Sequence, residues 1–371
     1  MLVGVPKEIK TEEYRVGMIP AAVSAVCARG HRVLVQKGAG SAVGFDDQAY
    51  LDAGAELIDS AEEVFERAQL LVKVKEPQPA ELALLRPVHL LFTFLHLAPD
   101  PELARGLLAS GASCLGYETV TDAQGRLPLL TPMSEVAGRL ATQAGAHHLE
   151  LPQGGRGLLL GGVPGVAPAR VVIVGGGVVG TQAARVAMGM GASVTLLDKS
   201  LPRLRELDAQ YGGRLVCEYA TSEALDRLLP DADLLVGAVL IAGAATPKIL
   251  SRDQLHRMQP GAVLVDVSID QGGCFESSRP TSHARPTYTQ AGVVHYCVAN
   301  IPSAVARTAT IALNHATLPS LLALADQGLE AIQRDPGLRA GLNIHSGAIT
   351  HPAVAEALEL EYRDPADVLQ T

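Results

Sequence analysis

Three scarcities limit the classes of protein to which this sequence can belong: it has no tryptophan, few lysines and no long apolar run. Only seven of its 30 basic residues are lysines, so a lysine in a special position is informative. The longest apolar run, LLVGAVLIAGAA, has 12 residues and is too short to span a bilayer. The start of the chain becomes charged at Lys7, too early for the apolar core of a signal peptide. We therefore expect a soluble, cytoplasmic protein.

Cysteine is also scarce, and its arrangement excludes a disulfide framework. The five cysteines are odd in number, widely spaced and never form C-x-x-C, the spacing of many zinc and redox sites. This pattern is typical of reduced thiols in the cytoplasm. The cysteines are Cys27, Cys114, Cys217, Cys274 and Cys297.

The charge balance argues against a nucleic-acid partner. The formal net charge is −9, and no run of Lys or Arg forms a local basic patch. With 371 residues, 48% of them hydrophobic and 37 of them glycine, the chain is long enough for two globular domains.

Short apolar runs alternate with helical patterns along most of the chain, which predicts parallel sheets covered by helices. Long helical patterns, starting near Thr131 and near Ser303, interrupt this alternation. We therefore expect an α/β protein with two doubly wound, Rossmann-like parallel-sheet domains joined by long helices. The helical pattern after Ser303 would carry the chain back to the first domain, so residues 1–130 and 306–371 would form one domain and residues 131–305 the other.

The segment VVIVGGGVVGTQAARVAMGMGASVTLLD predicts a dinucleotide site. Gly175, Gly177 and Gly180 form G-x-G-x-x-G between an apolar strand and a helix. These glycines permit a tight turn, close approach of a pyrophosphate and close packing of helix on strand. Asp198 ends the following strand, where a carboxylate binds the ribose hydroxyls and repels a 2′-phosphate. The expected cofactor is NAD.

Later strands of the same domain end near the expected position of the nicotinamide. These ends are Val239–Leu240, Ser268–Asp270 and Val298–Asn300. Asp270 is the ionisable side chain at these ends, and either turn initiation or catalysis explains an aspartate there.

The first domain carries three chemically complementary side chains at the corresponding edge. Arg15 follows the first strand, Lys75 follows LLVKV and His96 follows LLFTF. A guanidinium binds a carboxylate bidentately, an ammonium supplies a point charge and an imidazole transfers protons near neutral pH. Each residue alone has a structural explanation, but together they match one substrate. The pair His147–His148 has no further ligand cluster, so a surface or hinge role is favoured over a metal.

The sequence resembles the alanine dehydrogenases of the alanine dehydrogenase/pyridine nucleotide transhydrogenase family. The resemblance rests on GVPKEIKTEEYRVGMIP, LLVKVKEP, LFTFLHLAPD, TPMSEVAGRLATQAGAHHLE, the glycine motif, PGAVLVDVSIDQGGCFESSRP and HYCVANIPSAVARTAT. It implies reversible oxidation of L-alanine by NAD to pyruvate and ammonium, in a homohexamer. It also implies that residues 1–130 and 306–371 form the substrate domain and residues 131–305 the NAD-binding domain. Arg15 and Lys75 would bind the substrate carboxylate, His96 would be the acid/base, and Asp270 would lie beside the amine and the attacking water.

The resemblance also implies a set of cofactor contacts. Two positions depart from the family pattern: Phe94 stands where Tyr is common, and Ala220 where Ser can contact the adenosine. Two alternatives remain open, the nucleotide-binding subunit of a proton-translocating transhydrogenase and an NAD-sensing protein without turnover.

The implied cofactor contacts are Ser134, Gly175, Gly177, Val178, Val179, Gly180, Asp198, Arg203, Val239, Leu240, Val267, Ser268, Ile269, Asp270, Arg279, Val298, Ala299, Asn300 and Ile301.

Overall fold

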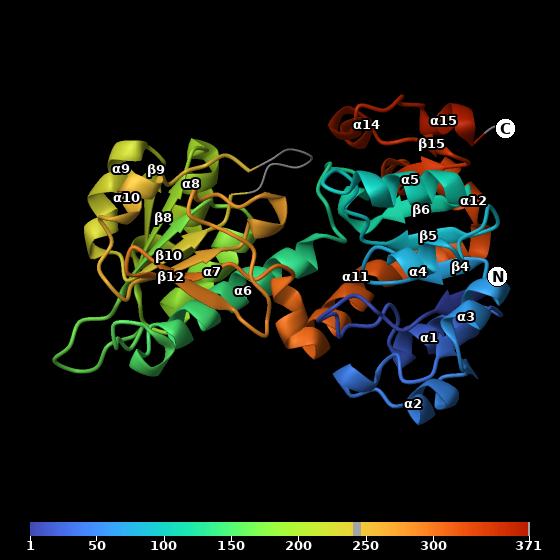
Figure 1. Ribbon diagram of the computed structural model, residues 1–371, viewed down its shortest axis with the longest axis horizontal. Helices are drawn as coiled ribbons and strands as arrows, with labels where there is room; N and C mark the ends of the chain where they lie inside the picture. Colours follow the sequence, from blue (N-terminus) through green and yellow to red (C-terminus); the bar gives the residue numbers. More distant parts are fainter. Residues whose placement is uncertain (240–245, 370–371) are drawn as a thin grey trace. The chain divides into compact units, whose positions relative to one another are not determined.

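The computed structural model describes residues 1–239 and 246–369 and divides the chain into two compact units (Figure 1). Unit 1 comprises Met1–Met133 and Val305–Thr371, and unit 2 comprises Ser134–Ala304. The boundary falls within helix α6 (Thr131–His148). Each unit has a mostly parallel sheet flanked by helices, so the predicted fold class is confirmed.

The sheet of unit 1 has the order β15-β14-β6-β5-β4-β1-β2-β3, in which β1 to β6 are parallel and β14 and β15 are antiparallel. The strand order reverses between β1 and β4, and ligands bind outside the carboxyl ends of strands at such a point. The strands are β1 (Leu2–Val5), β2 (Arg32–Gln36), β3 (Glu56–Ile58), β4 (Leu70–Val72), β5 (Leu90–Thr93), β6 (Ser113–Gly116), β14 (Leu342–His345) and β15 (Ala348–Ile349).

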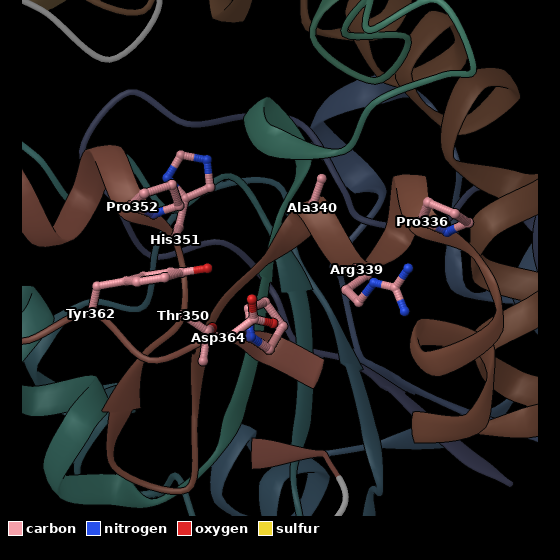
Figure 2. A pocket seen from close by; sticks show the side chains of 9 residues that line it. Pro336, Arg339, Ala340, Thr350, His351, Pro352, Tyr362 and Asp364 are labelled. Atoms are coloured by element: carbon pink, nitrogen blue, oxygen red, sulfur yellow. The ribbon is translucent and has the colours of Figure 1, made fainter. Parts of the chain in front are cut away.

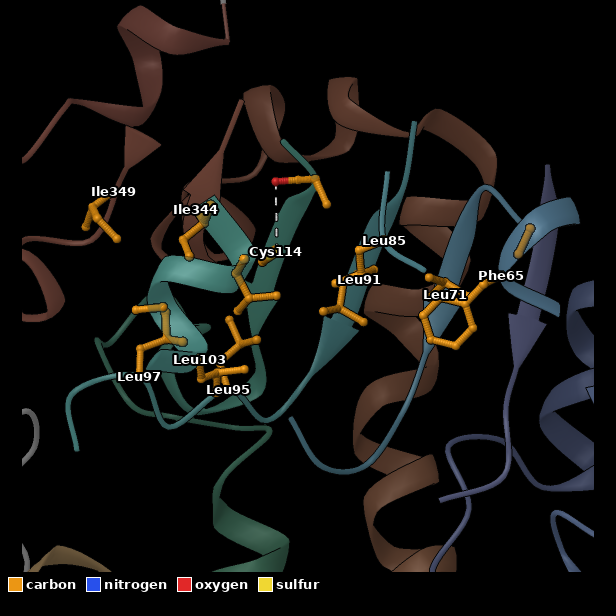
Figure 3. Packing of buried hydrophobic residues seen from close by; sticks show 14 of the residues in the cluster. Phe65, Leu71, Leu85, Leu91, Leu95, Leu97, Leu103, Cys114, Ile344 and Ile349 are labelled. Atoms are coloured by element: carbon orange, nitrogen blue, oxygen red, sulfur yellow. Dashed lines mark hydrogen bonds between the residues drawn. The ribbon is translucent and has the colours of Figure 1, made fainter. Parts of the chain in front are cut away.

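The core of unit 1 is built from both ends of the chain. Figure 3 shows Leu71, Leu91 and Cys114 of the central strands in the same cluster as Ile344 and Ile349 of the C-terminal segment. The C-terminal segment is therefore part of this fold rather than an appendage. The helices of the unit are α1 (Pro20–Cys27), α2 (Asp47–Asp52), α3 (Ala61–Arg67), α4 (Pro79–Leu82), α5 (Pro101–Ser110), α11 (Ala306–Gln327), α12 (Leu329–Arg334), α13 (Pro336–Gly341), α14 (Pro352–Leu358) and α15 (Pro365–Val368), with short 3₁₀ turns at Ser41–Val43 and Tyr117–Thr119.

Unit 2 repeats the same winding, with the order β12-β13-β11-β10-β7-β8-β9. All neighbours are parallel except the edge pair β12–β13, and the order reverses between β7 and β10. The elements are β7 (Arg170–Val174), α7 (Val178–Gly189), β8 (Ser193–Asp198), α8 (Leu201–Tyr211), β9 (Leu215–Tyr219), α9 (Ser222–Leu228), β10 (Leu234–Gly237), α10 (Arg252–Leu255), β11 (Val263–Asp266), β12 (Thr287–Gln290) and β13 (Val293–Tyr296), with 3₁₀ turns at Leu151–Gln153, Gly212–Arg214, Leu229–Asp231, Ile269–Gln271 and Ile301–Val305.

Some elements differ from the sequence patterns. Strands β3, β12, β14 and β15 are not predicted, because they are short edge or antiparallel segments without a buried apolar run. The long helical pattern after Ser303 is interrupted at Gly328, whose φ of 58° and ψ of −131° end α11 before α12 begins. None of the described helices is long and apolar enough to cross a membrane.

Candidate active site

Arg15, Lys75 and His96 all follow carboxyl ends of parallel strands in unit 1. Arg15 comes after β1 and Lys75 after β4, the two strands between which the sheet order reverses. The backbone continues to pair beyond the strands, since Phe94 N–H donates to the Val74 carbonyl at 3.2 Å. The Thr93 hydroxyl donates to the Lys75 carbonyl at 2.9 Å. The segments that carry Lys75 and His96 are therefore adjacent, as the alternation of strands predicts.

The Arg15 guanidinium is buried and fixed by Glu13. Arg15 Nε donates to Glu13 Oε1 at 2.8 Å and Nη2 donates to Oε2 at 2.5 Å, with the two side chains 2% and 0% exposed. Arg15 Nη1 contacts Met133 Sδ at 3.0 Å. Glu13 thus occupies the Nε–Nη2 edge, so a second carboxylate can be bound bidentately only by the Nη1–Nη2 edge. Sequence reasoning did not assign Glu13, although it lies two residues before Arg15.

A buried ion cluster supports the segment that carries Lys75. Lys73 Nζ lies 3.0 Å from Glu8 Oε2 and 2.7 Å from Glu81 Oε1, and all three side chains are buried. Glu8 Oε1 accepts the Val74 backbone N–H at 2.6 Å and the Lys75 N–H at 3.4 Å. Burial raises the pKa of Glu8, although Lys73 opposes that shift. This cluster fixes the backbone from which the Lys75 side chain extends.

His96 is held by its backbone and by its ring. Its φ of 49° is in the left-handed region, and its N–H donates to Glu118 Oε1 at 2.7 Å. The ring stacks on the buried Phe94 ring at 5.5 Å between centroids. Nδ1 faces Glu76 Oε2 at 3.7 Å. Phe94, one of the two departures from the family pattern, therefore packs directly on His96. Glu76 and Glu118 were not predicted, although Glu76 is adjacent to Lys75 in sequence.

The glycine motif of unit 2 forms the turn between β7 and α7. Gly175 has a φ of 108°, and an added Cβ at Gly180 would lie 1.8 Å from the Gly175 carbonyl oxygen. Both positions therefore require glycine. Gly177 precedes the first turn of α7, and an added Cβ there would have nothing within 4 Å. The arrangement is that of a backbone open to a phosphate at a helix N-terminus.

Asp198 lies at the end of β8, beside this turn. Its Oδ2 accepts the Gly176 N–H at 2.6 Å, and its Oδ1 accepts the Ser200 N–H at 2.7 Å. Arg203 also reaches the turn, since its Nε donates to the Gly176 carbonyl at 2.7 Å. The Ala220 N–H donates to the Asp198 carbonyl at 3.0 Å. The structure therefore brings together the glycine turn, Asp198, Arg203 and Ala220.

The loops after β11 and β13 meet at Asp270 and Asn300. The Asn300 N–H donates to Asp270 Oδ1 at 3.4 Å, and Asn300 has a φ of 61°. The Ser268 hydroxyl donates to the Val239 carbonyl at 2.5 Å. Asp270 is exposed. The structure thus joins residues of all three predicted strand ends, while Leu240 lies outside the described residues.

Asp266 organises the loop that carries Ser268 and Asp270. This fully buried carboxylate accepts the Ser268 N–H at 3.0 Å, the Cys274 N–H at 2.9 Å and the Ser278 hydroxyl at 2.5 Å. It was not predicted, although a single Asp in the apolar run AVLVDV is a visible signal. The remaining predicted contacts are distributed along the elements described: Ser134 lies in the first turns of α6, Val178 and Val179 begin α7, Val267 and Ile269 flank Ser268, and Val298, Ala299 and Ile301 flank Asn300.

Three further predicted features have local explanations. The Arg279 guanidinium is stacked over the Tyr288 ring, with Cζ 4.0 Å from the ring centroid. His147 is exposed and pairs with Glu150, whereas His148 is buried, so the surface alternative is wrong for His148 and the hinge alternative stays a prediction. The described residues contain no group of His, Cys, Asp and Glu side chains suited to hold a metal ion.

A cavity elsewhere in unit 1 does not contain these residues. It lies among the C-terminal elements from α13 to α15 (Figure 2). Its volume is about 340 Å³. No predicted site residue lines it. Its lining residues are Pro336, Arg339, Ala340, Thr350, His351, Pro352, Tyr362, Asp364 and Pro365.

Family models match most of the chain in two consecutive segments. The family model described as "Alanine dehydrogenase/PNT, N-terminal domain" matches residues 4–137, and the corresponding C-terminal domain matches residues 141–352. The chain belongs to the alanine dehydrogenase/PNT family. The resemblance of the sequence motifs to this family is thereby confirmed.

Within the alanine dehydrogenase/PNT family, full-length relatives identify the branch. The chain is 56% identical to the alanine dehydrogenase of Halomonas elongata over 370 residues, which is 100% of each chain. A solved L-alanine dehydrogenase structure matches with a TM-score of 0.93 and 49% identity, over 97% of this chain and 99% of that one. A transhydrogenase structure from Sinorhizobium meliloti matches over 95% and 100% with a TM-score of 0.80, but at 22% identity it supports the fold alone. The chain is therefore an oxidoreductase of the alanine dehydrogenase branch, and the transhydrogenase is a distant relative.

Proposed function

We propose that the chain catalyses the reversible NAD-dependent oxidative deamination of L-alanine to pyruvate and ammonium. Full-length identity to alanine dehydrogenases supports this reaction. The observation that carries the proposal is the shared edge of the unit 1 sheet, where a guanidinium, an ammonium and an imidazole follow successive strand ends. These groups are the ones needed to bind a small 2-amino or 2-oxo acid and to move its protons.

The residues of unit 2 fit a nicotinamide dinucleotide. The close approaches at Gly175 and Gly180 and the open space at Gly177 support a pyrophosphate on the N-terminus of α7. Ser268, Asp270 and Asn300 would line the nicotinamide side. The cofactor supplies a hydride acceptor when it is bound. We assign cofactor binding to unit 2 and substrate binding to unit 1.

NAD is favoured over NADP because Asp198 stands where the ribose hydroxyls would bind. Its carboxylate already accepts the Gly176 N–H of the phosphate-binding turn. A 2′-phosphate beside this carboxylate would meet a like charge, whereas hydroxyl groups can donate hydrogen bonds to it. Arg203 is held by Gly176, Thr181 and Glu206, so part of its charge is already offset by an acid.

The substrate carboxylate would be bound by Arg15 and Lys75. Glu13 fixes the guanidinium plane of Arg15, and Glu8 fixes the backbone of Lys75. The Arg15 guanidinium and the Lys75 backbone are therefore already ordered before the substrate binds. This arrangement positions Cα for hydride loss.

His96 would transfer protons at the reacting centre. It accepts a proton from the alanine ammonium, so that Cα can lose a hydride and an iminium forms. Water adds to the iminium carbon, and the carbinolamine loses ammonia to give pyruvate. His96 and Asp270 would share the proton transfers of these two steps, as general acid and base.

A homo-oligomer is also proposed, and by resemblance a hexamer. Helices α6 and α11 are rich in Ala and Leu, which favours a subunit interface, but neither helix carries a large exposed apolar side chain on its described residues. An apolar arm, residues 157–168, supports the proposal better. It has no charged residue, and Leu159, Val163 and Val166 are 67%, 52% and 61% exposed. A patch of this kind on an ordered turn is typical of a subunit interface.

Three substitutions test the assigned roles. Arg15→Ala should mainly raise the KM for L-alanine and pyruvate, because its contact with the carboxylate already exists in the ground state. His96→Ala should lower kcat by roughly 10²–10⁴-fold. Asp270→Asn should also lower kcat while NADH binding, measured by fluorescence titration, remains close to wild type. Full kcat in His96→Ala or Asp270→Asn would refute the proposed proton transfers.

A further inference from the structure

Two buried polar atoms face each other beside the proposed acid/base. His96 Nδ1 and Glu76 Oε2 are 3.7 Å apart. Both atoms are buried, and neither has a hydrogen-bond partner in the described part of the chain. A buried polar atom without a partner is costly, so two that face each other point to a contact that closes in another state of the site. Hydrogen bonds in active sites are often long before substrate binds.

Glu76 is held in place independently of His96. Lys10 Nζ donates to Oε1, the other carboxylate oxygen of Glu76. The Gln78 side-chain amide donates to the Glu76 backbone carbonyl at 3.0 Å. Burial raises the pKa of Glu76, but His96, Lys75 and Lys10 outweigh burial and lower the pKa to about 2. The side chain is therefore a carboxylate at any working pH and can only accept hydrogen bonds.

The other contacts of His96 fix the orientation of its ring but do not determine which ring nitrogen carries the proton. Glu118 binds the backbone N–H, and Phe94 stacks on the ring face, so neither contact distinguishes the two ring nitrogens. The neutral imidazole has one proton, on Nδ1 or on Nε2. Within the part of the chain that the structure describes, only Glu76 faces a ring nitrogen of His96, and its carboxylate favours the proton on Nδ1.

We propose that Glu76, held by Lys10, is a positioning residue that keeps the proton of neutral His96 on Nδ1, so that Nε2 accepts the proton of the substrate. This inference rests on the proposed acid/base role of His96. The charged groups that contact this part of the site are Glu76 at Nδ1, Glu118 at the backbone, and Lys10 and Lys75 beside Glu76. After proton transfer the imidazolium would be stabilised by the Glu76 carboxylate.

Glu76→Gln is a sharp test because Lys10 determines how the amide is oriented. Lys10 is only a donor, so it takes the amide oxygen and leaves the NH₂ group facing His96 Nδ1. Nδ1 then becomes the acceptor and the ring proton moves to Nε2, the atom that must receive the substrate proton. We expect kcat for L-alanine to fall by roughly 10²–10⁴-fold with the KM within about threefold of wild type.

A second substitution separates tautomer control from structural damage. In Lys10→Met/Glu76→Gln the amide is free to turn its oxygen toward Nδ1, so kcat should recover by about tenfold relative to Glu76→Gln. If the low kcat of Glu76→Gln came from structural damage, the second substitution would instead lower kcat further. Glu63→Gln, which changes an exposed carboxylate paired with Arg67 in the same unit, is the matched control and should leave kcat unchanged.

The tautomer itself can be measured by ¹⁵N chemical shifts of labelled histidine in the full-length protein, with His96 assigned from a His96→Gln sample. The expected result is a protonated Nδ1 in the wild type and a protonated Nε2 in Glu76→Gln. An unchanged tautomer in Glu76→Gln, or a double variant no faster than Glu76→Gln, would overturn the role of Glu76 while leaving the proposed function intact. A changed tautomer with unchanged kcat would uphold tautomer control and refute the acid/base role of His96.

Discussion

Lys73→Met should destabilise the protein strongly and weaken substrate binding, because Lys73 neutralises two buried carboxylates. The side chains of Lys73, Glu8 and Glu81 are 0%, 2% and 2% exposed, so solvent does not screen their charges. Methionine fills a similar volume but leaves Glu8 and Glu81 without a cation. Removing one partner from a buried ion pair costs about 3–5 kcal/mol. For a folding unit of this size that cost corresponds to a Tm lower by about 6–20 °C.

The loss of stability in Lys73→Met should also depend on pH, and the pKa of Glu8 determines whether it grows or shrinks as the pH rises. The pKa of Glu8 is raised by burial in the folded state, and Lys73 opposes this shift. A carboxyl group whose pKa is higher in the folded than in the unfolded state stabilises the folded protein at pH values below the unfolded-state pKa. That contribution is lost as the pH rises through the folded-state pKa. Without Lys73 the pKa of Glu8 rises further. The Tm difference between wild type and Lys73→Met should therefore be larger at pH 8 than at pH 5.

Thermal unfolding at the two pH values, with steady-state kinetics on the folded variant, tests this reasoning. Because Glu8 also accepts the Val74 and Lys75 N–H groups, the KM for pyruvate should rise in Lys73→Met. Lys37→Met is the matched control, since Lys37 forms an exposed pair with Asp59 and its loss should leave the Tm unchanged. A Lys73→Met protein with the wild-type Tm at pH 8 would refute the role assigned to the cluster.

Three other changes have expected outcomes. Arg15→Lys keeps the charge, but an ammonium cannot make bidentate contacts with both Glu13 and a substrate carboxylate. The KM for L-alanine should therefore rise by about tenfold or more; a KM within twofold of wild type would contradict this. Asp198→Ala should narrow the ratio of kcat/KM for NAD over NADP by roughly tenfold, consistent with losing a hydrogen bond to a charged group; equal use of both cofactors by the wild type would contradict the assignment. Val163→Asp in the apolar arm should lower the mass measured by light scattering, whereas Val216→Asp, at a position 50% exposed on β9, should not; a wild-type mass for both would separate the arm from assembly.

Features encoded in a contiguous stretch were predictable from the sequence. Gly175, Gly177, Gly180 and Asp198 lie within one strand–turn–helix–strand unit, so their mutual placement follows from local geometry. The shared edge of Arg15, Lys75 and His96 also follows, because parallel strands place their carboxyl ends on one side of a sheet.

Acidic residues that support these groups were not predictable in the same way. Glu118 binds the His96 N–H from 22 positions further along the chain, and Glu8 reaches the Val74 N–H from 66 positions away. Contacts of this kind have no sequence period, because they depend on which loops the fold brings together. Asp266 is an intermediate case, since an aspartate inside a buried strand signals an internal acceptor but not its partners.

The most direct test of the proposed function is product formation by the purified chain with L-alanine and NAD as the added reactants. We expect NADH, pyruvate and ammonium to form in equal amounts, and the reverse reaction to consume NADH when pyruvate and ammonium are supplied. A chain that binds NADH but forms none from L-alanine, and instead passes hydride from NADH to a second nucleotide, would contradict the proposal and favour a transhydrogenase.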